Sequence, residues 1–150
     1  NLDAWDGYAY DREVVYETLQ QLGKKAVVLA GDTHNAWAAT LHVHETNHEV
    51  GVEFATSSVS SPGIEYYLNV PAAEMVELEN AFKLLIDELD YCNLNQRGYL
   101  TVTFDHDQVV ADWKFVDTVK AREYKIDSTR SHQMAYDVHL KPIIEVAKTA

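Results

Sequence analysis

The stretch that decides the fold is Ala26-Val27-Val28-Leu29-Ala30-Gly31-Asp32-Thr33-His34, in which an apolar run ends at a glycine and an aspartate and a histidine follow. Such a run predicts a buried strand, and the ligands of α/β sheets gather at the carboxyl ends of these strands. The Asp32 carboxylate and the His34 imidazole suit divalent or trivalent metal ions. An ordinary polar turn is the alternative interpretation, because Asp-x-His is a short pattern.

The segments on either side of this strand show helical and extended patterns. Residues 10–22 place apolar side chains at helical spacing and end at Gly23, a residue typical of helix C-termini. Residues 37–43 and 50–54 show period-two alternation, which predicts two antiparallel strands. A loop rich in small hydroxyl residues, 56–63, follows the second of these strands.

The second half of the chain predicts one long helix and a hairpin. Residues 71–89 carry a single apolar stripe, which favours a helix, and residues 90–96 are typical of a polar loop. Residues 98–104 and 109–116 alternate around a short turn and predict a β-hairpin. The tail beyond the hairpin is less periodic, with a last short element expected at 139–144. Together these elements predict an α/β fold, called α+β in some schemes, in a single domain.

The composition limits the classes of partner. A chain of 150 residues can form one domain with a core, and its formal net charge of -12 argues against nucleic acid or an anionic membrane as the main partner. Cys92 is the single cysteine, so we interpret it as a buried or loop thiol. No apolar run in the sequence approaches the length of a transmembrane segment. Because the chain opens on Asn1 and not on Met, we expect a piece of a longer protein.

A set of motifs in a particular order points to a family. They are Asn1-x-Asp3-x-Trp5-Asp6-Gly7-Tyr8, residues 27–34 followed by Trp37-Ala38-Ala39, residues 52–63, Asn95-x-x-Gly98-Tyr99, and Trp113-x-Phe115-Val116-Asp117-Thr118-Val119. Each motif alone is weak, but their combination resembles the carboxyl-terminal portion of the alkaline phosphatase D (PhoD-like) family. These enzymes are secreted phosphatases and phosphodiesterases of the calcineurin-like metallophosphoesterase superfamily.

The resemblance implies a β-sandwich flanked by helices that performs metal-dependent phosphoester hydrolysis. The Gly-Asp-x-His motif of the family supplies metal ligands, and it matches Asp32 and His34 here. The substrate-pocket candidates that the resemblance implies are Asp6, Tyr8, Asn35, Ser57 and Ser58. Alternatively, Asp6 caps the helix that follows it, Tyr8 is a packed aromatic residue, and the serines belong to a structural turn.

The resemblance runs from residue 1 to about residue 120 and leaves 120–150 as an unmatched tail. Family members carry their first metal ligands upstream, so we expect the chain to need a missing N-terminal half of the same protein and to be inactive alone. Iron and calcium as cofactors, a phosphate ester as substrate and a periplasmic or secreted location are also implied. Because half a sandwich leaves sheet edges and an apolar face uncovered, we expect a homo-oligomer or a cleaved whole.

Three other interpretations of the chemistry stay open. His42 and His44 share a face of one predicted strand and could bind a metal ion with His48. The serines at 57–61 offer nucleophiles, although there is no Gly-x-Ser-x-Gly elbow and no His and Asp pair is placed by sequence to activate one. Finally, the chain could be a non-catalytic, cation-binding or structural piece.

Overall fold

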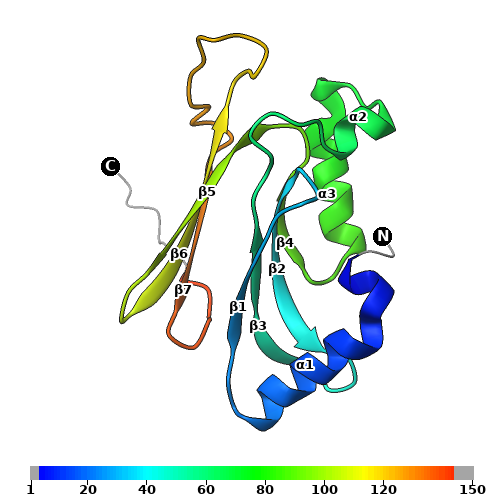
Figure 1. The fold of residues 1–150 in the computed structure, drawn as a ribbon, viewed down its shortest axis with the longest axis vertical. Helices are drawn as coiled ribbons and strands as arrows, with labels where there is room; N and C mark the ends of the chain where they lie inside the picture. The colour runs from blue at the N-terminus through cyan, green and yellow to red at the C-terminus, as the bar shows by residue number, and fades with distance from the viewer. Residues whose placement is uncertain (1–3, 144–150) are drawn as a thin grey trace.

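Two stacked β-sheets, with helices against one of them, form the part of the chain that the computed structural model describes, residues 4–143 without the Asp6 side chain. Figure 1 shows the longer helices on the face of the first sheet that points away from the second. This arrangement confirms the predicted α/β (α+β) sandwich. In order β1-β3-β2-β4, the first sheet contains β1 (Ala26–Ala30), β3 (His48–Ala55), β2 (Ala36–Val43) and β4 (Leu89–Asn93). The second, in order β5-β6-β7, contains β5 (Arg97–Phe104), β6 (Gln108–Val116) and β7 (His132–Asp137).

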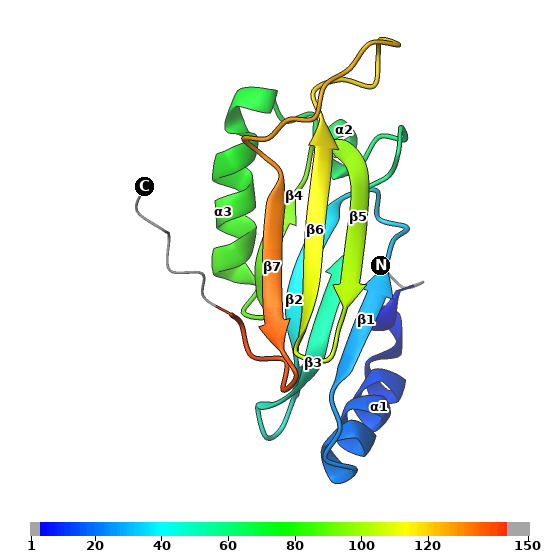
Figure 2. The same cartoon turned by 90° about the vertical axis from the view of Figure 1, so that its left-hand side faces the viewer.

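The predicted strand pairs form as the alternating patterns indicate. β2 and β3 are antiparallel, with Thr40 opposite Val52, and β1 runs parallel to β3 on its other side. β5 and β6 form the predicted hairpin, and β6 also pairs with β7 in the sheet that faces the viewer in Figure 2. Because β1 and β3 run in the same direction, their carboxyl ends lie at the same edge, where Thr56 N–H donates to the Ala30 carbonyl at 3.0 Å.

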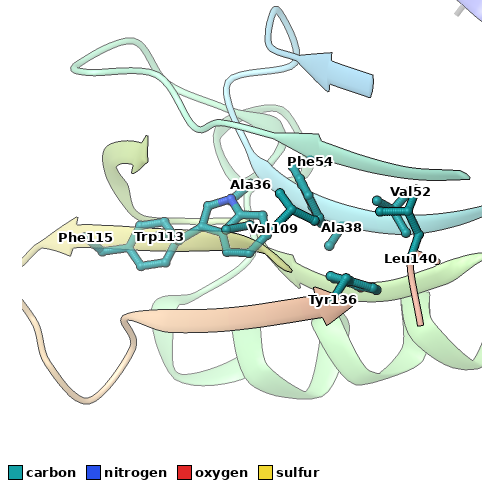
Figure 3. Close-up of a cluster of buried hydrophobic side chains, with 10 residues drawn as sticks. Ala36, Ala38, Val52, Phe54, Val109, Trp113, Phe115, Tyr136 and Leu140 are labelled. Carbon is teal, nitrogen blue, oxygen red and sulfur yellow. The ribbon is translucent and has the colours of Figure 1, made fainter. Parts of the chain in front are cut away.

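The main core lies between the two sheets (Figure 3). Trp113 of β6 is fully buried, and its ring meets that of Phe54 from β3 edge-on, with ring centroids 5.8 Å apart. The Trp113 indole N–H donates to the Ala55 carbonyl at 2.9 Å, which satisfies a buried polar group at the end of β3. The cluster consists of Ala36, Ala38, Val52, Phe54, Val109, Ala111, Trp113, Phe115, Tyr136 and Leu140.

The prediction of a buried strand at residues 26–30 is wrong in one respect. β1 does form, but it pairs only with β3 and is an edge strand among the described residues. Val27 and Val28 are half-buried on opposite faces, whereas Leu29 is 59% exposed. An apolar run gives the extended conformation but does not tell whether neighbours lie on both sides of the strand.

The predicted helix over 71–89 is shorter in the structure. A 3-10 turn, η2 (Ala72–Glu74), leads into α3 (Met75–Leu85), and the chain then becomes extended. The predicted polar loop at 90–96 is wrong, because its first part is β4, which pairs with β2. The side chain of Cys92 in β4 is buried against α3, and its thiol lies 3.6 Å from the Glu79 carbonyl. Tertiary pairing therefore gives a strand to residues whose polar composition indicates a loop.

A short helix and a strand later in the chain also have no counterpart in the sequence prediction. The short helix α2 (Ile64–Leu68) follows the serine-rich loop, and β7 completes the second sheet from within the tail. Of the element expected at 139–144, Pro142 forms an isolated bridge with Tyr136, and residue 144 lies outside the described residues. None of the described helices is long and apolar enough to cross a membrane.

The helix α1 (Ala9–Gln21), preceded by the 3-10 turn η1 (Trp5–Tyr8), ends where the sequence predicts. Gly23 adopts a φ of 59°, the left-handed conformation that glycine tolerates at helix ends. The helix uses Tyr16 and Leu19 to pack against the first sheet. In contrast, Val14 and Val15 are 44% and 45% exposed, so much of the predicted apolar stripe remains at the surface.

His132 of β7 should make the stability of the fold depend on pH. Its ring stacks on Tyr91, with centroids 4.1 Å apart, and burial lowers the pKa of the imidazole. The unfolded state, with a pKa of about 6.5, therefore gains a proton before the folded state does as the pH falls. We expect the free energy of unfolding to decrease from about pH 7 to pH 5 and this decrease to be smaller in His132→Phe, as measured by urea unfolding. Equal slopes in the two proteins would exclude this role.

Candidate functional site

The turn after β1 holds the two candidate metal ligands in an unusual backbone conformation. Asp32 and His34 have φ values of 67° and 62°, and the N–H of Thr33 between them donates to the Gly31 carbonyl at 2.8 Å. Left-handed backbone costs a non-glycine residue on the order of 1 kcal/mol, so the surroundings must stabilise it. Such local strain is often found at functional sites, so this turn is a candidate functional site.

The His34 imidazole is oriented by the serine-rich loop. Its Nδ1 lies 2.8 Å from the Pro62 carbonyl oxygen, which can only accept a hydrogen bond, so Nδ1 carries the proton in this contact. The other nitrogen, Nε2, has no hydrogen-bond partner among the described residues. A histidine that binds metal usually donates its second ring N–H to a carbonyl or carboxylate in this way. The arrangement therefore fits a ligand that binds through Nε2.

The Asp32 carboxylate is the second available donor. The residue is exposed, and no hydrogen bond or ion pair to its side chain occurs within residues 4–143. An anionic oxygen and an imidazole nitrogen are a suitable donor pair for a hard or borderline metal ion. They fit only part of a coordination shell, because the described residues contain no group of three or more His, Cys, Asp or Glu side chains that could hold a metal ion.

Asn35, a pocket candidate, is 1% exposed and ties together three segments. Its amide Nδ2 donates to the Leu94 carbonyl at 2.5 Å, and its Oδ1 accepts from the Ile64 N–H at 2.9 Å. Gly63 packs directly against this amide, since a Cβ there would lie 2.8 Å from the Asn35 Cγ. Asn35 thus links the turn after β1 to the start of α2 and to the segment before β5.

The serine candidates lie in the loop that packs beside the turn. Ser58 N–H is 3.4 Å from the His34 carbonyl, and the Ser58 hydroxyl donates to the Ser61 carbonyl at 2.5 Å. Ser57 is buried, and its hydroxyl has no hydrogen-bond partner among the described residues. Within residues 4–143, neither hydroxyl is hydrogen-bonded to a histidine.

The N-terminal candidates show no link to the turn. Tyr8 closes η1 and is 53% exposed, and in the described part of the chain it has no hydrogen bond or ring contact with Asp32 or His34. Asp6 also lies in η1, but its side chain is outside the described structure. Their role as pocket residues stays a prediction.

The competing histidines and the cysteine are placed elsewhere. His42 lies near the end of β2, His44 lies in the turn that follows, and His48 starts β3 opposite Val43. Within residues 4–143, no group of three or more metal donors forms around them. Cys92 is 4% exposed, and burial raises the pKa of its thiol to about 11. A protonated, buried thiol is a poor nucleophile and a poor metal ligand, which favours a packing role.

Sequence reasoning missed an ion pair beside the turn. Arg97, the first residue of β5, is 6% exposed and pairs with Glu65 of α2. Its Nη1 donates to the Gln96 carbonyl at 2.9 Å and lies 3.4 Å from the His34 carbonyl. The available signal was its position directly before Gly98 in the Asn95-x-x-Gly98-Tyr99 motif, where a charged residue begins an otherwise alternating strand.

Comparisons with known proteins agree on one family. The model of the PhoD-like phosphatase family matches residues 1–113. "Alkaline phosphatase D" of Bacillus subtilis (strain 168) is 39% identical over 67 residues, which cover 42% of this chain and 12% of that protein. A solved structure, "Structure of PhoD", superposes with a TM-score of 0.73 and 22% identity over 100% of this chain and 28% of that one. The chain therefore spans well under two thirds of the length of either relative.

Proposed function

Because the chain belongs to the PhoD-like phosphatase family, we propose that it supplies two metal ligands, Asp32 and His34, to a metal-dependent phosphoester hydrolase. The observation that carries the proposal is the turn after β1. There, a carboxylate without a partner among the described residues and an imidazole oriented by the Pro62 carbonyl occur two residues apart. The name of the family supports the reaction class, and the donor types support the metal.

Asp32 and His34 would each contribute one ligand to the metal ion. Asp32 would bind the metal ion through an anionic oxygen, and His34 would bind it through Nε2. Donation of the Nδ1 proton to the Pro62 carbonyl fixes the tautomer and the direction of the imidazole. When bound, the metal would supply Lewis-acid chemistry at the phosphoryl oxygens and a nucleophile at neutral pH. Iron and calcium are the metal ions that the family resemblance suggests.

We also propose that the remaining ligands come from an N-terminal part of the same protein, because two donors do not complete an octahedral shell. Such a part, or a second copy of this chain, would pack on the exposed apolar side chains of α1 and β1, which include Val14, Val15 and Leu29. The substrate would be a phosphate monoester or diester. A periplasmic or secreted location follows from the resemblance.

Chelation of metal should separate this proposal from a purely structural role. We expect the full-length protein to release nitrophenol from nitrophenyl phosphate or bis(nitrophenyl) phosphate, to lose this activity in a chelator and to regain it when metal is restored. The 150-residue chain, assayed beside it under the same conditions, should be inactive. A full-length protein that is inactive with every metal supplied would favour a cation-binding or structural piece. Activity that survives complete metal removal would overturn the proposal.

A further inference from the structure

The backbone carbonyl of His34 is held by two donors from different segments. The Ser58 N–H and the Arg97 guanidinium each lie 3.4 Å from this oxygen, at the long end of the hydrogen-bond range. Two long contacts to one carbonyl restrict ψ at a residue whose φ of 62° is already unfavourable. Arg97 is the donor with a charge, and such donors make the stronger hydrogen bonds.

Arg97 is itself held by a network that reaches the imidazole of the same histidine. The Glu65 carboxylate pairs with Arg97, and its same oxygen accepts from the Gly63 N–H at 3.1 Å. Gly63 directly follows Pro62, whose carbonyl accepts the Nδ1 proton of His34. The Arg97–Glu65 pair therefore contacts His34 in two ways. Arg97 contacts the His34 carbonyl directly, and Glu65 binds the N–H of the Pro62–Gly63 peptide group, whose carbonyl binds the His34 ring.

Packing and stability do not explain why Arg97 and Glu65 form an ion pair at this position. Arg97 is 6% exposed, and Glu65 Oε2 is buried without a hydrogen-bond partner among the described residues. Buried ion pairs contribute little to stability compared with apolar residues of the same size, and an unsatisfied oxygen weakens them further. A second pair in the chain, Arg130 with Glu79, is fully engaged, since both carboxylate oxygens of Glu79 accept from Arg130 at 2.7 and 2.8 Å.

We propose that Arg97 is a positioning residue, which acts with Glu65 to hold His34 in its left-handed conformation and to keep the proton of the ring on Nδ1. The consequence is that, in the neutral imidazole, Nε2 is the nitrogen with the free lone pair and points in one direction before any metal binds. The use of Nε2 for metal binding rests on the proposed function. The orientation of the ring does not, and it is measurable in the metal-free chain.

The test compares Arg97→Met alone with Arg97→Met combined with Glu65→Gln. The single variant leaves the half-buried Glu65 carboxylate without its cationic partner and should lose thermal stability. The double variant removes that charge, keeps an acceptor for the Gly63 N–H and should recover most of the melting temperature. We expect the ¹⁵N resonances of the His34 ring to show the Nδ1–H tautomer in the wild type and a mixture of tautomers in both variants. Arg97→Lys, which keeps one charged donor, should restore the signature in part.

A matched control uses an ion pair at the opposite end of β1. Lys25, which precedes β1, pairs with Glu49 of β3. Lys25→Met combined with Glu49→Gln removes a charged pair away from the turn and should leave the His34 resonances unchanged. If the double variant at positions 97 and 65 regains both its melting temperature and the wild-type His34 spectrum, the pair has only a structural role and the inference is overturned.

Titration with Mn²⁺, followed by broadening of the His34 resonances, separates this inference from the proposed function. We expect the wild-type chain to bind Mn²⁺ and the 97/65 double variant to bind it about 10- to 100-fold more weakly, the range typical for loss of a residue that orients a ligand. If the tautomer changes in the variants but Mn²⁺ leaves the wild type unaffected, positioning is supported and the metal role of His34 fails. If the tautomer changes but both proteins bind Mn²⁺ with equal affinity, positioning is likewise supported and His34 is not the group that binds the ion.

Discussion

Replacement of His34 by alanine in the full-length protein is expected to remove metal-dependent phosphoester hydrolysis, with a loss of at least about 100-fold in kcat/KM. Asp32→Ala should have a similar effect. Loss of either donor opens a coordination position, so the ion binds more weakly and its geometry at the phosphoryl group is no longer fixed. Release of nitrophenol at saturating metal, together with the metal content of each purified variant, measures the effect.

The controls for these variants must separate ligand loss from backbone strain. Alanine tolerates positive φ poorly, whereas asparagine adopts it more readily, so Asp32→Asn and His34→Asn test the chemistry with less strain. His44→Ala removes an imidazole from the exposed end of the β2–β3 pair and should leave activity unchanged. Wild-type activity in both alanine variants would exclude Asp32 and His34 as ligands.

Trp113→Ala is expected to have the largest effect on stability, with a loss of about 3–5 kcal/mol in the free energy of unfolding. The ring is fully buried between the sheets and contacts Phe54 and Tyr91, with centroid distances of 5.8 and 5.2 Å. Its removal leaves a cavity and also deprives the Ala55 carbonyl of its indole donor. Urea unfolding followed by circular dichroism measures the change.

Two further variants separate the contribution of the indole N–H from that of packing and provide a surface control. Trp113→Phe keeps most of the packing and loses the N–H, so it should cost about 1–3 kcal/mol through the unsatisfied carbonyl and the smaller ring. Tyr99→Ala on β5, where the side chain is 49% exposed, should change stability by less than about 1 kcal/mol. A Trp113→Ala protein as stable as the wild type would show that this core does not hold the sheets together.

Much of the fold follows from local patterns in the sequence. The apolar run at 26–30, the alternation at 109–116 and the glycine after α1 each predict an element that the structure confirms, because backbone preference and side-chain period act within a few residues. The positions of Asp32 and His34 at the carboxyl end of a strand follow from the same run. These features need no knowledge of what lies across the sheet.

The features that the sequence did not predict depend on distant partners. Residues 89–93 contain Asp90 and Asn93, which disfavour strands, yet they extend along β2 because that edge offers a row of backbone hydrogen bonds. The ion pair of Arg97 is with Glu65, which lies 32 positions away in a helix too short for helical periodicity to predict. Neither partner is visible from spacing alone, because both contacts form only when segments that are distant in the sequence come together in the fold.

The edge position of β1 affects how precisely the chain can present its two donor groups. A strand with one hydrogen-bonded neighbour opens locally at lower free energy than a strand between two, and the residues that follow it share that freedom. A polypeptide that docks along the side of β1 where no strand pairs within residues 4–143 would add a second row of backbone hydrogen bonds and suppress such fraying. The rigidity of the Asp32–His34 turn would then be set by assembly, so that ion affinity and subunit or segment association become thermodynamically linked.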